Sequence, residues 1–383
     1  MFDLKFGASE PESFGENLVR ETLALVRAWL TAHPDTETIL NHLPALELAL
    51  AAHVKNHDTK LLSLVTSALE RVNTNAAHET GANTILAEFI LLNLRVFQLT
   101  RDAQFQNAAQ RALDVAKARW DEERAWFKPS ATDATNVFYA DANAQLGQAF
   151  YFAWRALEDQ TLRPIAGEVL GQMSSVFDPN AALYATDELP GEDINTLGVR
   201  AAAMQLFLTA SETTGRRTYM TRASILAEDA VKNLDLNGTL DERAKFADAL
   251  LRLEQFAGIA RARDTAREIL KQAAAQTHAN VDAAALALAV EHANQFPLHV
   301  VVIGDVENDE TAQALWFAAM NEYASTRAIE VLHPTQHAAR IQQLGYFASD
   351  KSALAYICIG TLCLPPVSSL DAFHTAMQRA HSA

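Results

Sequence analysis

The feature that most constrains the fold is a helical pattern that repeats along most of the chain. Apolar residues recur three and four positions apart, and the breaks between these stretches carry Pro, Gly, Asn or Asp. The pattern predicts twelve helices with boundaries good to about two to four residues. They cover residues 12–32, 39–55, 58–75, 83–100, 102–119, 141–157, 160–176, 195–214, 217–234, 241–257, 262–277 and 281–292.

The helix ends resemble one another, which indicates repeated helix pairs. One kind of break follows Phe97, Thr214 and Ala257, and two of its three examples contain Gly, which accepts the left-handed conformation that ends many helices. The other kind is an aromatic-Asp pair followed by a second aromatic residue, as in Trp120-Asp121 before Trp126-Phe127 and Phe177-Asp178 before Tyr184. This second kind predicts a short hairpin that folds back on the helix end.

Repeating helix pairs predict either a solenoid or a closed ring. A solenoid needs a polar cap at each end, but the stretch Ala283–Val290 in the last predicted helix is apolar all round. A helix of that kind is buried in the folded protein. We therefore expect it to close a ring against the first helix, which predicts a mainly α fold with an (α/α)6 toroid over residues 1–295.

The periodicity changes at Phe296-Pro297. Short runs rich in β-branched residues predict buried strands at 298–303, 327–332 and 353–359. Predicted helices at 308–322 and 369–381 alternate with these strands, which predicts parallel pairing. Residues 296–383 are therefore expected to form a small C-terminal α/β unit.

Charge and hydropathy exclude some classes of partner. The chain has 383 residues, with 31 Lys and Arg against 47 Asp and Glu, and a net charge of -16. This argues against nucleic acid and anionic membranes, since basic residues supply the affinity for both. The N-terminus does not have the pattern of a signal peptide, and no apolar stretch reaches the roughly 18–20 residues that span a bilayer. We predict a cytoplasmic protein.

The two cysteines, Cys358 and Cys363, are predicted to be reduced structural thiols, because cytoplasmic thiols rarely form disulfides. Redox and metal roles are weaker alternatives, and two cysteines alone do not make a zinc site. No cofactor is expected either. The Gly304-Asp305 turn falls short of a nucleotide-binding motif, and the acids Glu307, Asp309 and Glu310 that follow it would repel phosphate.

The C-terminal unit resembles a known family. The run from Leu298 to Asp305, the segment Ala355-Tyr356-Ile357-Cys358 and the segment Cys363-x-Pro365-Pro366-Val367 are similar to the end of the spermatogenesis-associated proteins that carry a thioredoxin-like domain. In that family a thioredoxin-like domain precedes a helical toroid related to the six-hairpin glycosidases and the N-acylglucosamine 2-epimerases. The resemblance implies the same toroid here.

The sequence departs from this family in one large respect. It contains no Cys-x-x-Cys motif, and it begins about where the toroid of the family begins. The redox role of the thioredoxin-like domain is therefore not carried over, and the resemblance implies a fold more firmly than a reaction.

Candidate ligand-binding residues lie where inner helices are expected to start, because these ends converge on one mouth of a toroid. An alternative role for such residues is helix capping, since Asp and Asn satisfy free N–H groups. Two aromatic residues join them, because sugars stack on aromatic rings and these two are predicted to lie on loops; the usual role of aromatic residues is core packing. The candidates are His78, Trp126, Tyr139, Asp141, Asn143, Asp193, Asn195 and Asp241.

Three functions remain open at this point. The first is a non-catalytic or weakly active toroid that binds a sugar-like small molecule or a protein. The second is a sugar epimerase, isomerase or glycoside hydrolase that uses Asp141, Asp193 or Asp241 with a nearby His. The third is a scaffold that recruits a separate thioredoxin-like protein in trans. No residue pair in the sequence selects a catalytic set.

Overall fold

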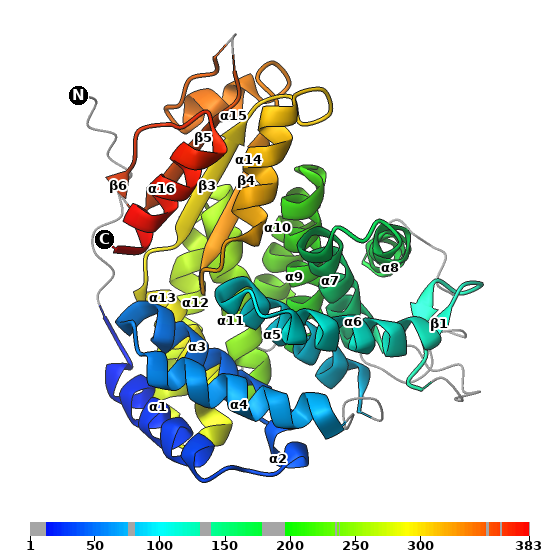
Figure 1. The fold of residues 1–383 in the computed structure, drawn as a ribbon, viewed down its shortest axis with the longest axis vertical. Coiled ribbons are helices and arrows are strands. Elements are labelled where there is room, and N and C mark those ends of the chain that lie inside the picture. The colour runs from blue at the N-terminus through cyan, green and yellow to red at the C-terminus, as the bar shows by residue number, and fades with distance from the viewer. Residues whose placement is uncertain are drawn as a thin grey trace.

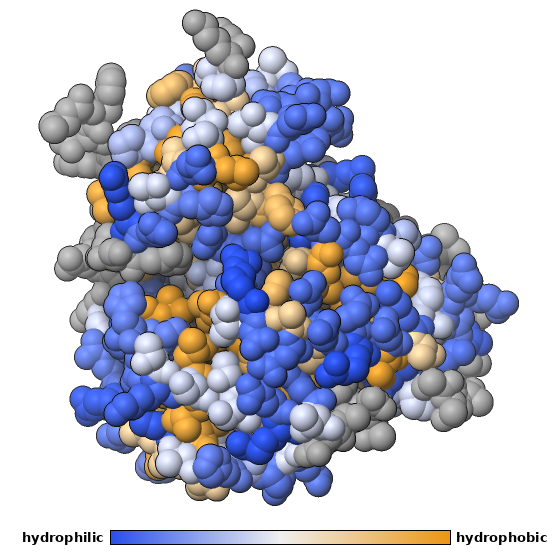
Figure 2. Space-filling model, viewed as in Figure 1, coloured by the Kyte–Doolittle hydropathy of each residue, from blue (hydrophilic) through white to orange (hydrophobic). Residues whose placement is uncertain are grey.

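The computed structural model describes residues 13–75, 81–130, 139–177, 196–233, 236, 238–349, 352–360 and 362–382. These residues form a helical toroid with a small sheet and its helices stacked at one end (Figure 1). In the face seen in Figure 2, hydrophilic residues cover much of the surface, and hydrophobic residues appear in scattered patches. Within the described residues, no helix combines the length and the apolar character needed to cross a bilayer.

Two concentric layers of helices make the toroid. The inner layer consists of α3 (Leu43–Asn56), α5 (Asn83–Thr100), α7 (Ala140–Leu157), α9 (Leu197–Thr214), α11 (Leu240–Ala257) and α13 (Ala284–Asn294). The outer layer consists of α1 (Glu16–Thr31), α4 (Thr59–Asn75), α6 (Ala103–Ala118), α8 (Leu162–Val176), α10 (Thr218–Asn233) and α12 (Ala260–Gln276). The predicted (α/α)6 toroid of twelve paired helices is confirmed.

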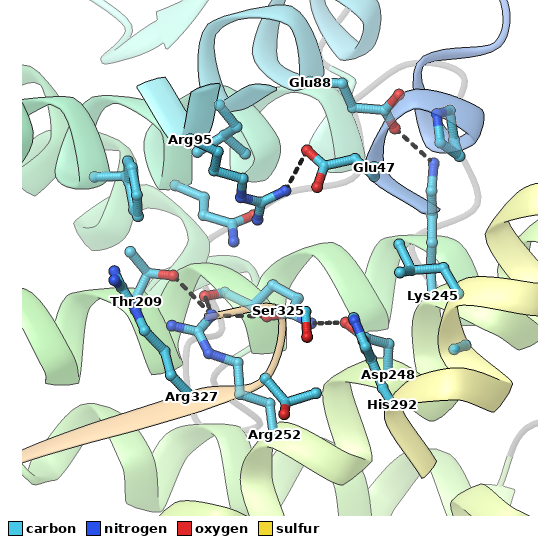
Figure 3. Close-up of a pocket in the computed structure, with 18 of the residues that line it drawn as sticks. Glu47, Glu88, Arg95, Thr209, Lys245, Asp248, Arg252, His292, Ser325 and Arg327 are labelled. Carbon is cyan, nitrogen blue, oxygen red and sulfur yellow. Dashed lines mark hydrogen bonds and ion pairs between the residues drawn. The ribbon is translucent and has the colours of Figure 1, made fainter. Parts of the chain in front are cut away.

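The hydrophobic pattern decides which layer each helix joins. The outer helix α12 buries Ala262, Ala266, Leu270 and Ala273, which lie three or four residues apart on one face. The inner helix α9 is buried on every side, from Leu197 to Thr213. A helix buried all round needs neighbours on both flanks, and each inner helix packs against the next one. The space that they enclose holds the polar side chains of Figure 3.

The ring closes where α13 packs against both α1 and α3. Gly15, which precedes α1, has a left-handed backbone (φ 67°), and a Cβ placed on it would lie 2.8 Å from Val290 of α13. The Asn294 side chain donates to the carbonyl oxygen of Phe14 at 2.7 Å and accepts from its N–H at 3.3 Å. The closing role predicted for the last helix is confirmed, and only glycine suits position 15.

The repeated breaks have the predicted conformations. Gly215 and Gly258 are left-handed, with φ of 71° and 67°, and Arg101 occupies the same conformation at the third break, with φ of 57°. The first aromatic-Asp break forms a hairpin of β1 (Trp120–Asp121) and β2 (Trp126–Phe127). Residues 178–184, where the second hairpin is predicted, lie outside the described part of the chain. The short helix α2 (Thr36–Leu40) was not predicted.

The C-terminal unit contains a four-stranded sheet in the order β4-β3-β5-β6. Its strands are β3 (Leu298–Ile303), β4 (Arg327–Leu332), β5 (Leu354–Ile359) and β6 (Leu362–Cys363). Helices α14 (Glu310–Asn321) and α16 (Leu370–Ser382) pack on one face, and α15 (Ala338–Gln343) packs on the other.

The prediction of parallel pairing is correct for β3 with β4 and wrong for β5, which runs antiparallel to β3. A parallel β5 would need a connection that returns along the whole sheet. The six-residue helix α15 was missed in the sequence, and it is too short for that return. Leu354 therefore begins β5 opposite Ile303, at the end of the sheet where β4 stops.

The prediction of reduced thiols is also wrong, because Cys358 and Cys363 form a disulfide. Strands β5 and β6 pair so that the two residues lie directly opposite, with Cα atoms 4.0 Å apart. Gly360 permits the tight turn between the strands with a φ of 55°, and a Cβ there would lie 2.6 Å from the ring of Phe296. The prediction was wrong because it rested on an expected reducing compartment, although the spacing of the two cysteines made a disulfide geometrically conceivable.

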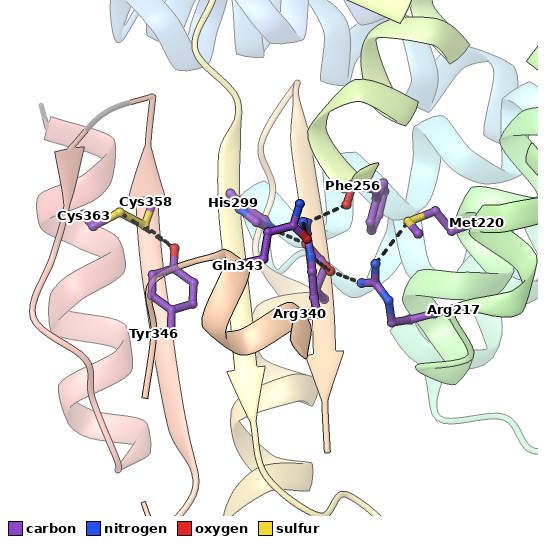
Figure 4. Close-up of polar contacts among 10 residues, drawn as sticks. Arg217, Met220, Phe256, His299, Arg340, Gln343, Tyr346, Cys358 and Cys363 are labelled. Carbon is purple, nitrogen blue, oxygen red and sulfur yellow. Dashed lines mark hydrogen bonds and ion pairs between the residues drawn. A yellow bond between two sulfur atoms is a disulfide. The ribbon is translucent and has the colours of Figure 1, made fainter. Parts of the chain in front are cut away.

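The unit sits at the C-terminal ends of the inner helices. The Trp316 indole donates to the carbonyl oxygen of Glu212 at 3.1 Å, and the Gln98 side chain donates to that of Met320 at 3.1 Å. A buried carboxylate makes a further connection (Figure 4). Glu330 of β4, with a side chain 2% exposed, pairs with Arg217 of the toroid, with Arg340 at 2.7 Å and with His299 at 3.0 Å.

We predict that Glu330→Gln lowers the free energy of unfolding by about 3 kcal/mol, because it leaves buried guanidinium groups without their counter-charge. Urea denaturation measures the change. The matched control is Glu228→Gln, which removes an exposed pair with Lys232 and should cost less than about 0.5 kcal/mol. An equal effect of the two substitutions would show that the Glu330 cluster does not hold the unit in place.

The same carboxylate predicts a pH dependence of stability. Burial alone would raise the pKa of Glu330, but hydrogen bonds and charges from His299 and Arg340 outweigh it and lower the pKa to about 2 from an ordinary value of 4.5. A carboxyl group with a lowered pKa stabilises the fold above its unfolded pKa, and this contribution is lost as the pH falls from about 4.5 toward 2. Unfolding measured across this range should show a smaller pH dependence for Glu330→Gln than for the wild type. Parallel curves would contradict the prediction.

Candidate functional site

The toroid encloses a cavity of about 270 Å³, which we call the lumen. All six inner helices contribute to its wall, and residues 323–327, which lead into β4, contribute at the end occupied by the C-terminal unit. The lumen therefore has a floor at the C-terminal ends of the inner helices. Its apolar lining includes Leu43, Leu91, Phe152, Leu251 and Leu288.

Toward the N-terminal ends of the inner helices, a lysine bridges two carboxylates. Lys245 of α11 lies 3.2 Å from Glu88 of α5 and 3.0 Å from Asp241, one turn earlier on its own helix. Asp241 is 54% exposed and Glu88 is 30% exposed, so the bridge runs from the surface into the lumen. The cation holds two like charges close together.

A histidine-aspartate pair lies farther along the same wall. The Nδ1 atom of His292 on α13 lies 2.6 Å from Oδ1 of Asp248 on α11, and the other oxygen of Asp248 accepts from Gln205 at 3.0 Å. Because Nδ1 faces a carboxylate, it carries a proton, and in the neutral imidazole the opposite ring nitrogen, Nε2, presents a lone pair. Nε2 is buried and has no hydrogen-bond partner.

Arginines gather near the floor, each beside an acceptor. Arg252 donates to Glu212 at 2.9 Å, to Gln205 at 2.7 Å and to Thr209 at 2.9 Å. Arg95 donates to Glu47 at 2.5 Å, and Arg327 donates to the carbonyl oxygen of Glu322. In Figure 3, Glu47, Glu88 and Arg95 lie on one side of the space, and Asp248, His292 and Arg252 lie on the other.

The surroundings shift the pKa values of two lumen carboxyl groups in opposite directions. Burial raises the pKa of Glu88, and the nearby charges of Asp241 and Glu47 raise it further, while Lys245 opposes the change. Burial would also raise the pKa of Asp248, but His292, Arg252 and Arg95 outweigh it and lower the pKa. Glu88 is thus the group that holds a proton more readily, and Asp248 stays ionised beside His292. This separation is typical of acid and base roles in an active site.

Within the described part of the chain, no three His, Cys, Asp or Glu side chains lie close enough together to hold a metal ion. An imidazole with a free lone pair, a carboxyl group with a raised pKa and several guanidinium groups suit proton transfer and the stabilisation of a developing oxyanion.

Five of the candidate residues predicted from the sequence can be placed, and none of those five lines the lumen. Trp126 lies on β2 rather than on a loop and is 7% exposed, and Tyr139 precedes α7 and is 42% exposed. Asp141 occupies the first turn of α7. Asn143 bonds the backbone of Phe127 and Tyr139. Asp241 reaches the site indirectly, through Lys245.

His78, Asp193 and Asn195 lie outside the described residues. Asp141, Asn143 and Asp241 lie at the starts of inner helices, as expected, but polar residues farther along those helices form the lumen. The residues missed in the sequence are Glu47, Glu88, Arg95, Glu212, Lys245, Asp248 and Arg252. One signal would have found Glu47, which stands alone between Leu46 and Leu48 in a stretch that is otherwise apolar from Leu43 to Ala52.

No family model matches this sequence, and no curated protein matches it. Solved structures do share its fold. The GH76A alpha-1,6-mannanase from Salegentibacter sp. HEL1_6 superposes with a TM-score of 0.58 at 14% identity, covering 73% of this chain and 97% of that chain. An unsaturated glucuronyl hydrolase specific for heparin superposes with a TM-score of 0.54 at 12% identity, covering 68% of this chain and 84% of that chain.

A third structure, the Lin0763 protein from Listeria innocua, has a TM-score of 0.52 at 12% identity over 67% of this chain and 83% of that chain. These likenesses establish that the helical ring has the six-hairpin glycosidase-like fold. An inactive variant of the mannanase carries substitutions at two consecutive aspartates. The present sequence has no two consecutive aspartates.

The lysine bridge predicts how the pKa of Glu88 changes when Lys245 is replaced. Lys245→Met should raise the pKa of Glu88 further above 4.5, because the substitution removes the cation that opposes burial. Carbon-13 NMR of the labelled carboxyl group measures the titration. Lys232→Met, on the exposed face of α10, is the matched control and should leave Glu88 unchanged. A wild-type Glu88 that titrates below 4.5 would contradict this account of the lumen.

Proposed function

We propose that the protein is a sugar-converting enzyme that moves a proton on a small sugar bound in the lumen, with His292 as the base. The observation that carries the proposal is that Nε2 of His292 has no hydrogen-bond partner, while Nδ1 of the same ring is held by Asp248. A base held in one tautomer and shielded from water is what proton abstraction from carbon requires.

Residues of the lumen take up and supply the protons that the proposed step moves. Nε2 of His292 takes the proton from the carbon next to the carbonyl group of an open-chain sugar. The electrons of that C–H bond form a carbon-carbon double bond, and the carbonyl oxygen receives a proton from Glu88 or is held by the nearby cations. Return of the proton to the same carbon on the other face gives an epimer, and the enol O–H proton then passes back to Glu88 as the carbonyl group re-forms. Return of the proton to the neighbouring carbon gives an isomer, and the hydroxyl group on the first carbon then gives its proton to Glu88 as it becomes the new carbonyl group.

The size of the lumen supports a small substrate. A volume of about 270 Å³ lies just below the range of pockets that hold drug-sized ligands, roughly 300–1,000 Å³. The floor built by residues 323–327 closes one end, so a long chain cannot pass through the ring. A monosaccharide or the end of a short oligosaccharide fits this shape.

Glycoside hydrolysis is the second candidate. The opposed pKa shifts of Glu88 and Asp248 favour it, and so does the fold shared with glycoside hydrolases. However, hydrolysis needs two carboxyl groups with access to the bond and to water. Both oxygens of Asp248 already accept hydrogen bonds, from His292 and from Gln205. Asp248 is therefore better suited to orienting His292 than to attacking a sugar.

The other functions expected from the sequence gain no support from the lumen. A ring without catalytic activity does not require a fixed histidine tautomer, and recruitment of a separate thioredoxin-like protein stays a prediction. Membership of the spermatogenesis-associated family likewise stays a prediction that rests on the C-terminal residues.

We expect the wild-type protein to incorporate deuterium from D2O at the carbon next to the carbonyl group in at least one member of a panel of aldoses, ketoses and amino sugars. Proton NMR detects this exchange without knowledge of the product. His292→Asn should slow the exchange about 10²–10⁴-fold, because it removes the base. His278→Asn, at an exposed position on the connection after α12, is the matched control and should exchange like the wild type.

Two results would count against proton transfer. Exchange that survives in His292→Asn would remove His292 from the reaction. Release of nitrophenol from nitrophenyl glycosides, together with an absence of exchange in every sugar, would favour hydrolysis instead.

A further inference from the structure

The lumen contains buried hydrogen-bond acceptors that nothing in the protein satisfies. Among the described residues that line it, the side-chain atoms without a partner are Oε1 of Gln98, Gln145, Glu212 and Gln255, and Nε2 of His292. They belong to residues of five of the six inner helices, and all five residues line the same cavity. Unsatisfied buried polar atoms cost about 1–3 kcal/mol each, so five in one cavity call for an explanation.

Three of these atoms can only accept. Gln98 donates its amide N–H to the carbonyl oxygen of Met320, so the amide is oriented with its oxygen free. Glu212 is a carboxylate whose second oxygen is bound by Arg252, while its first lies 3.9 Å from Arg327, beyond hydrogen-bonding distance. Nε2 of His292 is an acceptor because Nδ1 holds the proton toward Asp248.

The cationic donors of the lumen differ, because the protein supplies each of them with an acceptor. Arg95 bonds Glu47, Lys245 pairs with Glu88 and Asp241, Arg252 bonds Glu212, and Arg327 bonds a backbone carbonyl oxygen. Four acidic and four basic side chains line the described lumen, counting the histidine as neutral. With all four carboxyl groups ionised, these charges cancel and leave no surplus of positive charge to hold an anion.

The geometry of the helices also disfavours an anion in the lumen. Gln98, Glu212 and Gln255 lie within the last turn of α5, α9 and α11, where the backbone carbonyl groups carry the negative end of the helix dipole. A negatively charged group placed at the floor would meet these carbonyl groups and the free acceptors together. A hydroxyl or ammonium group would meet complementary partners.

We infer that the lumen selects a sugar rich in hydrogen-bond donors and without negative charge, either a neutral hexose or a hexosamine, and disfavours sugar acids and sugar phosphates. The inference rests on the proposed function for the location of the site. It narrows the substrate class by the chemistry of the unpaired atoms. A carboxylate or phosphate brings only acceptors to a site whose buried, unpaired polar atoms are acceptors.

Calorimetry with the full-length protein tests the inference, with glucose, mannose and glucosamine as one set of probes and glucuronate and glucose 6-phosphate as the other. The first set should contain a ligand that binds at least about tenfold more tightly than either anion. Gln255→Leu removes one free acceptor and should raise its Kd about fivefold. Gln255→Glu keeps an acceptor there and should bind more nearly like the wild type.

Gln272→Leu, on the exposed face of α12, is the matched control and should bind like the wild type. The melting temperature of each variant without sugar shows that it is folded. Tighter binding of an anion would overturn the inference, and so would failure of every probe to bind.

The binding test separates this inference from the proposed reaction. Binding of a neutral sugar that depends on Gln255, without deuterium exchange, would support the ligand class and count against proton transfer. Exchange that depends on His292, with tighter binding of an anion, would support proton transfer and overturn the ligand class.

Discussion

Closure of the ring by α13 is the constraint on which the rest of the structure depends. The stretch Ala284–Val290 of this helix is apolar on every side, so the helix is stable only with neighbours all round it. It finds them in α1, α3, α11 and α12, and the contact of Val290 with Gly15 brings the two ends of the toroid together. The same packing places His292 opposite Asp248 of α11, so the contacts that close the ring also position this pair of the candidate site.

A second constraint follows from the first, because a closed ring of helices traps polar side chains in a poorly hydrated space. Charged groups survive there only when they are paired. The lumen meets this requirement with Arg95 beside Glu47, Lys245 beside Glu88 and Arg252 beside Glu212. The acceptors that stay unpaired are the exceptions to this pairing. They distinguish a binding site from an interior in which every polar group has a hydrogen-bond partner.

The sequence predicted most of the fold, because the helices depend on local pattern. The spacing of apolar residues placed all twelve ring helices, and the apolar stretch at Ala283–Val290 indicated closure. It misjudged β5 and the disulfide of Cys358 with Cys363, because both depend on how short strands pair across the sheet. Local pattern contains little information about such pairing.

The candidate site was much harder to predict. Most of the predicted site residues are expected at the starts of inner helices, where residues such as Asp141 and Asn143 follow the usual rules of capping and turns. The lumen is instead formed by residues such as Glu88 and Asp248, which lie within helices and come together only through the ring. An inner helix is buried on all sides, so its sequence pattern does not show which face points into the lumen. That orientation depends on the tertiary packing of the ring.

A crystal structure of the protein grown with glucosamine or glucose tests the central claim most directly. The account predicts one sugar in the lumen, with hydroxyl or ammonium groups within about 3.2 Å of Oε1 of Gln98, Oε1 of Glu212 and Nε2 of His292. Sugar bound only on the outer surface, with an unoccupied lumen at saturating concentration, would contradict the account.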